Sequence, residues 1–183
     1  MRDYFQPLDP KVVVDMSCAT GLFTRRLAKS NVYDRVIACD YSDSMLMEAR
    51  NRIRTDPDLS SGKLSTTLDL VRCDVGDIPM QDESVDALHA GAAMHCWPDL
   101  DSAMSEIHRV LKPGGRFFAT TFLAAYFSNV KGISGESVQE KAFQYFESVD
   151  VLRDIVKKGG FTEENINIEV LGSACVVIRA EKE

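Results

Sequence analysis

The sequence predicts one doubly wound α/β domain built on a seven-stranded, mostly parallel sheet. Short apolar runs without polar alternation, typical of strands covered on both faces, alternate with segments whose apolar residues recur at helical spacing. Repeated units of this kind produce a parallel sheet with right-handed connections. A length of 183 residues suffices for one core but is short for two. We therefore treat residues 1–183 as a single domain.

Two β-α units open the chain. Strand 11–16 precedes a helix over 20–30, and strand 35–40 precedes a helix that Ser42 caps. Asp43 falls in the first turn of that helix, where the helix dipole favours an acid. Helical spacing predicts four side chains on its inner face, namely Met45, Leu46, Ala49 and Ile53.

The same alternation continues through the middle of the chain. Strands are predicted at 68–73 and 84–90, and a helix follows at 100–111. The stop signal Lys-Pro-Gly-Gly at 112–115 precedes a strand at 116–122. A helix at 149–158 comes next, bounded by a serine cap and two glycines.

The tail departs from this parallel pattern. Ile166, Ile168 and Val170 alternate with polar residues, which indicates a half-exposed edge strand, whereas 174–178 is apolar throughout and indicates an interior strand. Gly172-Ser173 between them is a hairpin signal, so we expect one antiparallel strand beside its edge partner. A dinucleotide-binding sheet usually continues in parallel. The antiparallel tail therefore argues against a dinucleotide-binding sheet.

Composition excludes several classes of partner. The 21 basic and 28 acidic residues give a formal charge of -7, which repels nucleic acid and anionic lipid. No apolar run approaches the roughly 20 residues of a membrane span, so we expect a soluble protein. Five cysteines without paired spacing predict a reducing compartment, no disulfide framework and no metal site. The N-terminus resembles neither a signal nor a transit peptide.

Candidate binding residues cluster where the predicted strands end, because ligands of open α/β sheets bind outside these carboxyl ends. Small residues over 15–21 let a ligand approach the backbone. They directly precede a helix, whose N-terminal amides can hold a carboxylate. Asp40, 19 residues after Gly21, can accept the hydroxyl protons of a ribose. Asp74 can accept an adenine amine, and Val75 can offer its backbone N–H. A single acid at a strand end more often forms a cap or turn, but three such loops together favour a nucleoside cofactor.

Four segments resemble the successive motifs of class I S-adenosylmethionine-dependent methyltransferases: 12–23, 39–46, 84–99 and 106–115. The resemblance extends from about Tyr4 to the C-terminus, and its most specific part is the His-Ala-Gly-Ala to His-Cys-Trp-Pro stretch within 89–98. The chain is most similar to the plastid-type plant and algal branch, itself similar to the ubiquinone/menaquinone C-methyltransferases. This resemblance implies a Rossmann-like fold and S-adenosyl-L-methionine as cofactor. The reducing compartment is then the cytoplasm or, by the resemblance, the plastid.

The resemblance also implies which residues hold the cofactor. They are Asp15, Ser17, Cys18, Ala19 and Gly21 at the methionine end, Asp40 at the ribose, Tyr41 and Met45 against the adenine, Asp74 and Val75 at the adenine edge, and Gly91 and Ala92 near the sulfonium.

Two features depart from the family pattern. Ala19 stands where glycine is usual, and its methyl group is expected to crowd the cofactor or oppose a positive φ. The chain begins about ten residues before the first strand, so we expect the helices that usually cover the cofactor to be missing or reduced.

Methyl transfer needs alignment, exclusion of water and in some cases a base. His95 is the candidate base and Trp97 a candidate wall for the acceptor, although His95 could equally bond a backbone carbonyl and shape the turn. His89 and His108 are expected to be structural.

Residues 123–147 form a long connection rich in aromatic side chains, which is typical of a lid. We expect Tyr126 and Phe127 to contact an apolar or aromatic acceptor, although these aromatics could instead anchor the lid. No Asn-Pro-Pro-Tyr segment follows the fourth strand, which argues against methylation of amide or base nitrogens.

Three functions are consistent with the sequence. The first is methyl transfer to a small-molecule acceptor; the second is binding of S-adenosylmethionine without turnover; the third is nicotinamide-dependent oxidation and reduction. The acceptor atom and the oligomeric state stay open.

Overall fold

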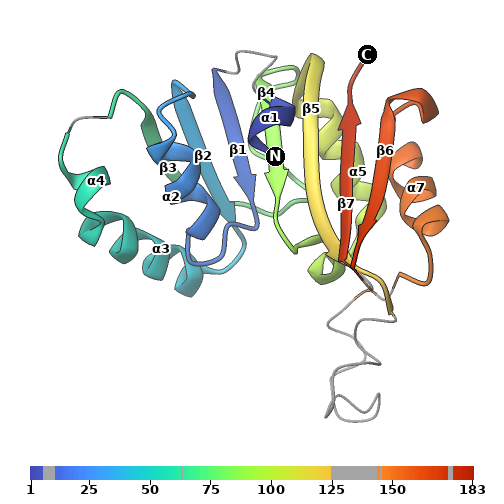
Figure 1. Ribbon diagram of the computed structural model, residues 1–183, viewed down its shortest axis with the longest axis horizontal. Coiled ribbons are helices and arrows are strands. Elements are labelled where there is room, and N and C mark those ends of the chain that lie inside the picture. Colours follow the sequence, from blue (N-terminus) through green and yellow to red (C-terminus); the bar gives the residue numbers. More distant parts are fainter. Residues whose placement is uncertain (6–10, 63, 125–143, 145, 173–174) are drawn as a thin grey trace, which may run out of the picture.

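The computed structural model describes residues 1–5, 11–62, 64–124, 144, 146–172 and 175–183. Its strands form one seven-stranded sheet in the order β3-β2-β1-β4-β5-β7-β6 (Figure 1). β1 to β5 run parallel, and β7 runs antiparallel to β5 and β6. The expected mixed sheet with its antiparallel C-terminal strand is therefore confirmed. The strands are β1 (Val12–Met16), β2 (Arg35–Asp40), β3 (Thr67–Arg72), β4 (Val85–Ala90), β5 (Leu111–Phe122), β6 (Ile166–Leu171) and β7 (Cys175–Glu181).

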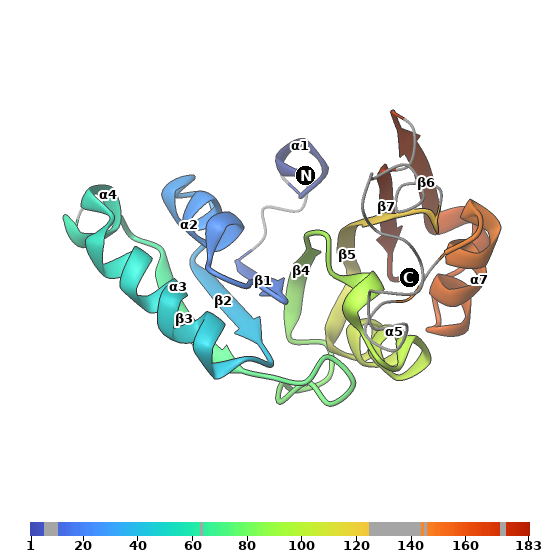
Figure 2. The same cartoon turned by 90° about the horizontal axis from the view of Figure 1, so that it is seen from below.

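Helices cover both faces of the sheet. The described helices are α1 (Arg2–Phe5), α2 (Leu22–Lys29), α3 (Asp43–Thr55), α4 (Pro57–Ser60), α5 (Leu100–Val110) and α7 (Val149–Lys158), with 3₁₀ turns η2 (Met94–Cys96) and η3 (Glu163–Asn165). Figure 2 shows α1 and α2 on one face of the sheet and α5 and α7 on the other. Each face buries its own apolar cluster, one around Leu27 and Phe118 and one around Leu88 and Ile107. Such two-faced burial leaves the strand ends as the place for a site.

Two local predictions differ from the structure. β5 begins at Leu111, before the Lys-Pro-Gly-Gly stop, because the residue before Pro113 is biased toward extended backbone. In α3, Met45 was expected on the inner face but is 41% exposed, and Ala49 is the buried residue. α3 begins just after the carboxyl end of β2, so its first turn lies beyond the core.

The connection from β3 to β4 contains no helix and is held by α5. Glu106 accepts a hydrogen bond from the backbone N–H of Ile78 at 2.7 Å. Arg109 donates to the carbonyl oxygens of Ile78 and Met80 at 2.9 and 2.8 Å. The bonds from Arg109 to Glu106 also hold the pKa of that carboxyl below its usual range. This clamp fixes the loop that follows the end of β3.

Replacement of Arg109 by methionine should destabilise the fold by about 1–3 kcal/mol, because part-buried carbonyl oxygens and Glu106 lose their donor. Urea unfolding of Arg109→Met measures the change. Arg50→Met, on the exposed side of α3, is the matched control and should shift the midpoint little. Equal midpoints for the two variants would contradict a role for the clamp.

Candidate active site

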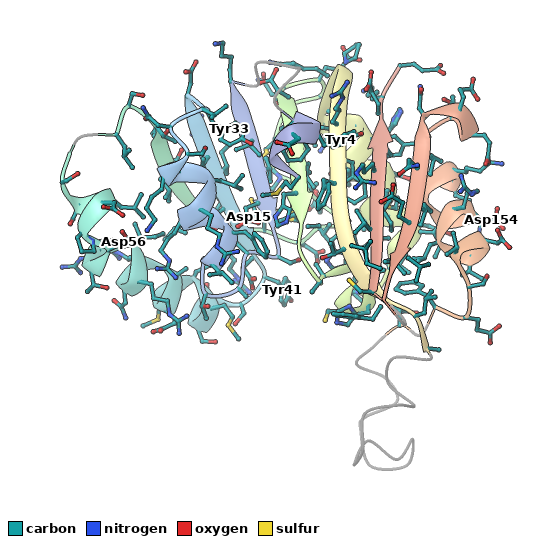
Figure 3. All side chains as sticks on the ribbon, in the orientation of Figure 1. Tyr4, Asp15, Tyr33, Tyr41, Asp56 and Asp154 are labelled. Atoms are coloured by element: carbon teal, nitrogen blue, oxygen red, sulfur yellow. The ribbon has the colours of Figure 1, made fainter. Side chains whose placement is uncertain are left out.

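A cavity of about 600 Å³ lies at the carboxyl ends of β1 to β4. Figure 3 places Tyr41 at this edge of the sheet and Asp15 deeper within the domain. The wall combines residues from four strand ends and η2. They are Ser17, Ala19, Asp40, Tyr41, Ser42, Met45, Cys73, Asp74, Val75, Gly91, Ala92, Ala93, Cys96, Trp97 and Pro98.

The loop after β1 reaches the cavity through Ser17 and Ala19, both of which adopt left-handed backbone with φ of 56° and 47°. The methyl group of Ala19 therefore does not prevent a positive φ, and that part of the expectation is wrong. Left-handed backbone costs about 1–2 kcal/mol per residue. Two hydrogen bonds offset this cost: Trp97 Nε1 donates to Ser17 Oγ at 2.9 Å, and Ala19 N donates to Asp40 Oδ2 at 2.8 Å.

Three residues of the same predicted group lie behind the cavity wall. Asp15 and Cys18 are buried, and neither lines the cavity. Gly21 precedes α2 with φ of 74°, and a Cβ on it would lie 3.2 Å from the Cβ of Ala49. This glycine is required by the start of α2 and by its packing on α3. Asp15, Cys18 and Gly21 thus support the loop from within.

Asp40 presents its carboxylate at the end of β2. Oδ1 accepts from Ser42 N at 2.9 Å, and Oδ2 accepts from Ala19 N. Because a carboxylate oxygen accepts about two hydrogen bonds, each oxygen keeps one position for a ligand hydroxyl. Tyr41 is 65% exposed beside it, with the Arg72 guanidinium 5.4 Å from its ring. This arrangement suits a ribose and a flat ring.

Asp74 faces the same cavity from the end of β3. Its Oδ1 accepts from Gly76 N at 2.9 Å, which leaves its second oxygen for a ligand donor. Val75 follows as a largely buried wall residue. Asp40 and Asp74 therefore lie in one cavity, as a single nucleoside ligand requires.

The β4 side of the cavity is a wall of small residues. Ala92 has φ of 52°, and its N–H donates to Thr120 Oγ1 at 2.8 Å. A Cβ on Gly91 would lie 2.9 Å from His89 Cε1, so only glycine fits between the wall and that imidazole. Small side chains here let a ligand approach the backbone closely.

His95 is buried beneath this wall and does not line the cavity. Its Nδ1 lies 3.3 Å from Thr121 Oγ1, and its ring meets Phe122 edge to face. Burial lowers the pKa of His95, which keeps the imidazole neutral near pH 7. The expected acceptor contacts Tyr126 and Phe127 lie outside the described residues.

The structure adds wall residues that the sequence did not single out. They are Ser42, Cys73, Ala93, Cys96 and Pro98. All are neighbours of predicted site residues, so proximity within a motif is the signal that could have found them. Among the described residues no cluster of acids, histidines and cysteines could hold a metal ion, and none of the described helices has the length and apolar content of a membrane span.

The fold and the acid-lined cavity define an α/β domain with a candidate ligand site at its strand ends. The methyltransferase domain model matches residues 14–119, more than half of the 183-residue chain, and the chain belongs to that family. This confirms the resemblance carried by its motifs.

Several known proteins are similar to this chain. Two uncharacterized chloroplastic methyltransferases of Arabidopsis thaliana are 46% identical over 122 residues and 37% identical over 163, which cover 67% and 87% of the chain. A ubiquinone/menaquinone biosynthesis C-methyltransferase of Desulfotalea psychrophila is 27% identical over 88% of the chain and 70% of its own length. The chain spans only 34% and 45% of the two Arabidopsis relatives.

A solved structure supports the fold. The SAM-dependent methyltransferase of Methanosarcina mazei superposes with a TM-score of 0.77 at 18% identity, covering 99% of this chain and 95% of the other. At this identity the likeness shows the architecture of the sheet and its helices.

Gly91→Ala should destabilise the domain by about 1–3 kcal/mol, because the added methyl group would lie only 2.9 Å from His89 Cε1 and 3.2 Å from Phe23 Cδ2. Urea unfolding provides the measurement. Gly76→Ala is the matched control, since a Cβ there meets its neighbours at 3.5 Å or more. A Gly91→Ala protein as stable as this control would disprove the close approach.

Proposed function

We propose that the protein binds S-adenosylmethionine in this cavity and transfers its methyl group to a small-molecule acceptor. The observation that carries the proposal is the convergence of Asp40 and Asp74 on one cavity with the loop after β1. The bound cofactor would supply a methyl group already activated on a sulfonium. The protein would supply alignment and exclusion of water.

Each part of the wall has a role in this proposal. Asp40 accepts hydrogen bonds from the ribose hydroxyls, while Asp74 and the Val75 N–H bind the adenine edge. Tyr41 and Met45 flank the adenine, and their exposure leaves their apolar surface available for it. The N-terminus of α2, behind the loop after β1, would favour the methionine carboxylate electrostatically.

Removal of the Asp40 carboxylate should weaken binding of S-adenosylmethionine by about 1–3 kcal/mol through lost charge-assisted hydrogen bonds. Isothermal calorimetry on Asp40→Ala measures the effect. Asp69→Ala is the control, because Asp69 pairs with Arg35 at the surface of the sheet. Unchanged affinity in Asp40→Ala would contradict the placement of the ribose at Asp40.

Binding without turnover is the alternative to be separated. It is supported by Ala19, which lines the cavity where the family has glycine. Binding of the cofactor with no methyl transfer to a panel of quinones, phenols and acids would favour it. Membership of the methyltransferase family weighs against the nicotinamide alternative, and binding of NAD in place of S-adenosylmethionine would restore it.

The acceptor side is part of the same proposal. Trp97 is buried in the cavity wall and would border the acceptor, with Tyr126 and Phe127 completing the site. The chloroplastic relatives support a plastid location, and the quinone C-methyltransferase relative supports an aromatic ring as acceptor.

His95 lies behind the wall, one residue before the lining residue Cys96, and is the proposed base because a neutral imidazole can take a proton. His95→Asn should reduce methyl transfer by about 100-fold or more while leaving cofactor affinity within about twofold. Turnover and calorimetric affinity are measured on the same preparation. Full turnover in this variant would assign His95 to the packing of η2.

A further inference from the structure

Two buried thiols lie beneath the part of the cavity formed by the ends of β2 and β3. Cys39 is the residue before Asp40 on β2, and Cys73 is the residue before Asp74, just after β3. Both cysteines belong to one apolar cluster, with exposed fractions of 0% and 5%. Each thiol is therefore one residue away from a carboxylate that lines the cavity.

The register of the two strands places these side chains on one face of the sheet. β2 and β3 are parallel neighbours, and Cys39 lies opposite Val71 (Figure 1). The pairing continues past the end of β3, where the N–H of Cys73 donates to the carbonyl oxygen of Asp40 at 3.0 Å. Side chains two positions apart share a face, so Cys73 lies on the same face as Val71 and Cys39.

The two thiols form a chain of hydrogen bonds. The side chains of Cys39 and Cys73 are hydrogen-bonded to each other. Cys73 Sγ also donates to the carbonyl oxygen of Asp74 at 3.2 Å. Because the Cys73 S–H is directed to that carbonyl, its sulfur accepts the S–H of Cys39. The two sulfurs are thus in contact in the reduced protein, in which all five cysteines are free.

The two thiols differ in reactivity. The hydrogen bond to Cys73 and burial raise the pKa of Cys39, whereas the same hydrogen bond lowers the pKa of Cys73 below its ordinary value. The thiolate is the form that attacks a disulfide. Cys73 also lines the cavity, so a small molecule that enters can reach its sulfur, and Cys39 lies behind it. Cys73 is therefore the attacking thiol and Cys39 the second one.

The other three cysteines do not combine these properties. Cys18 does not line the cavity, and burial raises the pKa of its thiol to about 12. Cys96 lines the cavity, but burial raises its pKa as well. Cys175 lies on β7 and is not part of the cavity wall. Among the described residues, the Cys39–Cys73 pair is thus the one that joins an accessible attacking thiol to a second sulfur.

We propose that Cys39 and Cys73 are a modification site for low-molecular-weight disulfides, which convert the pair into an internal disulfide bond. Cys73 loses its proton to solvent in the cavity, and its sulfur attacks one sulfur of the small disulfide. The S–S bond of that molecule breaks, and one of its halves leaves as a thiolate. The Cys39 sulfur then attacks the Cys73 sulfur, gives its proton to solvent and displaces the second half. Two cysteine thiols are oxidised while one disulfide is reduced to two thiols.

The new bond displaces the cavity wall. A disulfide bond is about 2.05 Å long, which is shorter than a hydrogen-bonded contact between two sulfurs. Because Cys73 lies two positions beyond Val71, closure draws the end of β3 back toward Cys39, and Asp74 moves with it. The α5 clamp holds the loop at Ile78, so residues 73–77 take up the movement. The effect on the cofactor rests on the proposed function, whereas the modification itself does not.

The test treats the full chain with hydroxyethyl disulfide, which is uncharged and is not repelled by Asp40 and Asp74. Peptide mapping by mass spectrometry should find one bond, between Cys39 and Cys73, that dithiothreitol removes. Calorimetry on the same preparations should show that oxidation weakens binding of S-adenosylmethionine about tenfold or more and that reduction restores it. Saturation with S-adenosylhomocysteine should slow the modification, because the bound ligand covers Cys73.

Three variants assign the chemistry. Cys39→Ala lacks the second thiol and should accumulate the mixed disulfide at Cys73. Cys73→Ala should stay unmodified at Cys39. Cys175→Ala, on β7, is the matched control and should oxidise and lose affinity as the wild type does. Circular dichroism verifies that the variants fold, and the mapping of the wild-type protein decides the proposal even if one of them does not.

The outcomes separate this inference from the proposed function. Absence of a disulfide, a bond mapped to Cys18 or Cys96, or unchanged affinity in fully oxidised protein overturns the inference. If the reduced protein binds neither S-adenosylmethionine nor S-adenosylhomocysteine, the proposed function fails, and the mapped bond then decides the modification alone.

Discussion

Parallel pairing of β1 with β2 and β4, and of β2 with β3, brings four strand ends to one edge of the sheet. Asp40 and Asp74 are 34 positions apart in sequence and share a cavity only because these registers hold. Glu106 and Arg109 of α5 also form hydrogen bonds with the loop after β3 and so fix its position. Strand pairing therefore determines where the candidate site forms, and the side chains at the strand ends determine its chemistry.

The loops at this edge use backbone conformations that ordinary residues avoid. Ser17, Ala19 and Ala92 all have left-handed φ although none is glycine. Each forms a hydrogen bond with a neighbouring loop or strand: Ser17 accepts from Trp97, Ala19 donates to Asp40, and Ala92 donates to Thr120. Local strain at the wall is thus balanced by contacts between segments distant in sequence.

Periodicity predicted most of the fold because it records which face each residue buries. The alternation over 166–170 correctly indicated the edge strand, and the acids at strand ends marked the cavity. Sequence could not reveal that Asp15 turns inward, because its direction depends on pairing with His89, 74 residues away. Nor could helical spacing show that Met45 lies beyond the core, since that depends on where the sheet ends.

The hydrogen bond from Trp97 to Ser17 has a practical consequence. Trp97 is the chain's single tryptophan, and its indole is buried in the cavity wall with its N–H fixed on the loop after β1. Any molecule that enters the cavity changes the polarity around this one fluorophore. The protein thereby carries an intrinsic optical reporter, whose emission can follow occupancy in real time without a label.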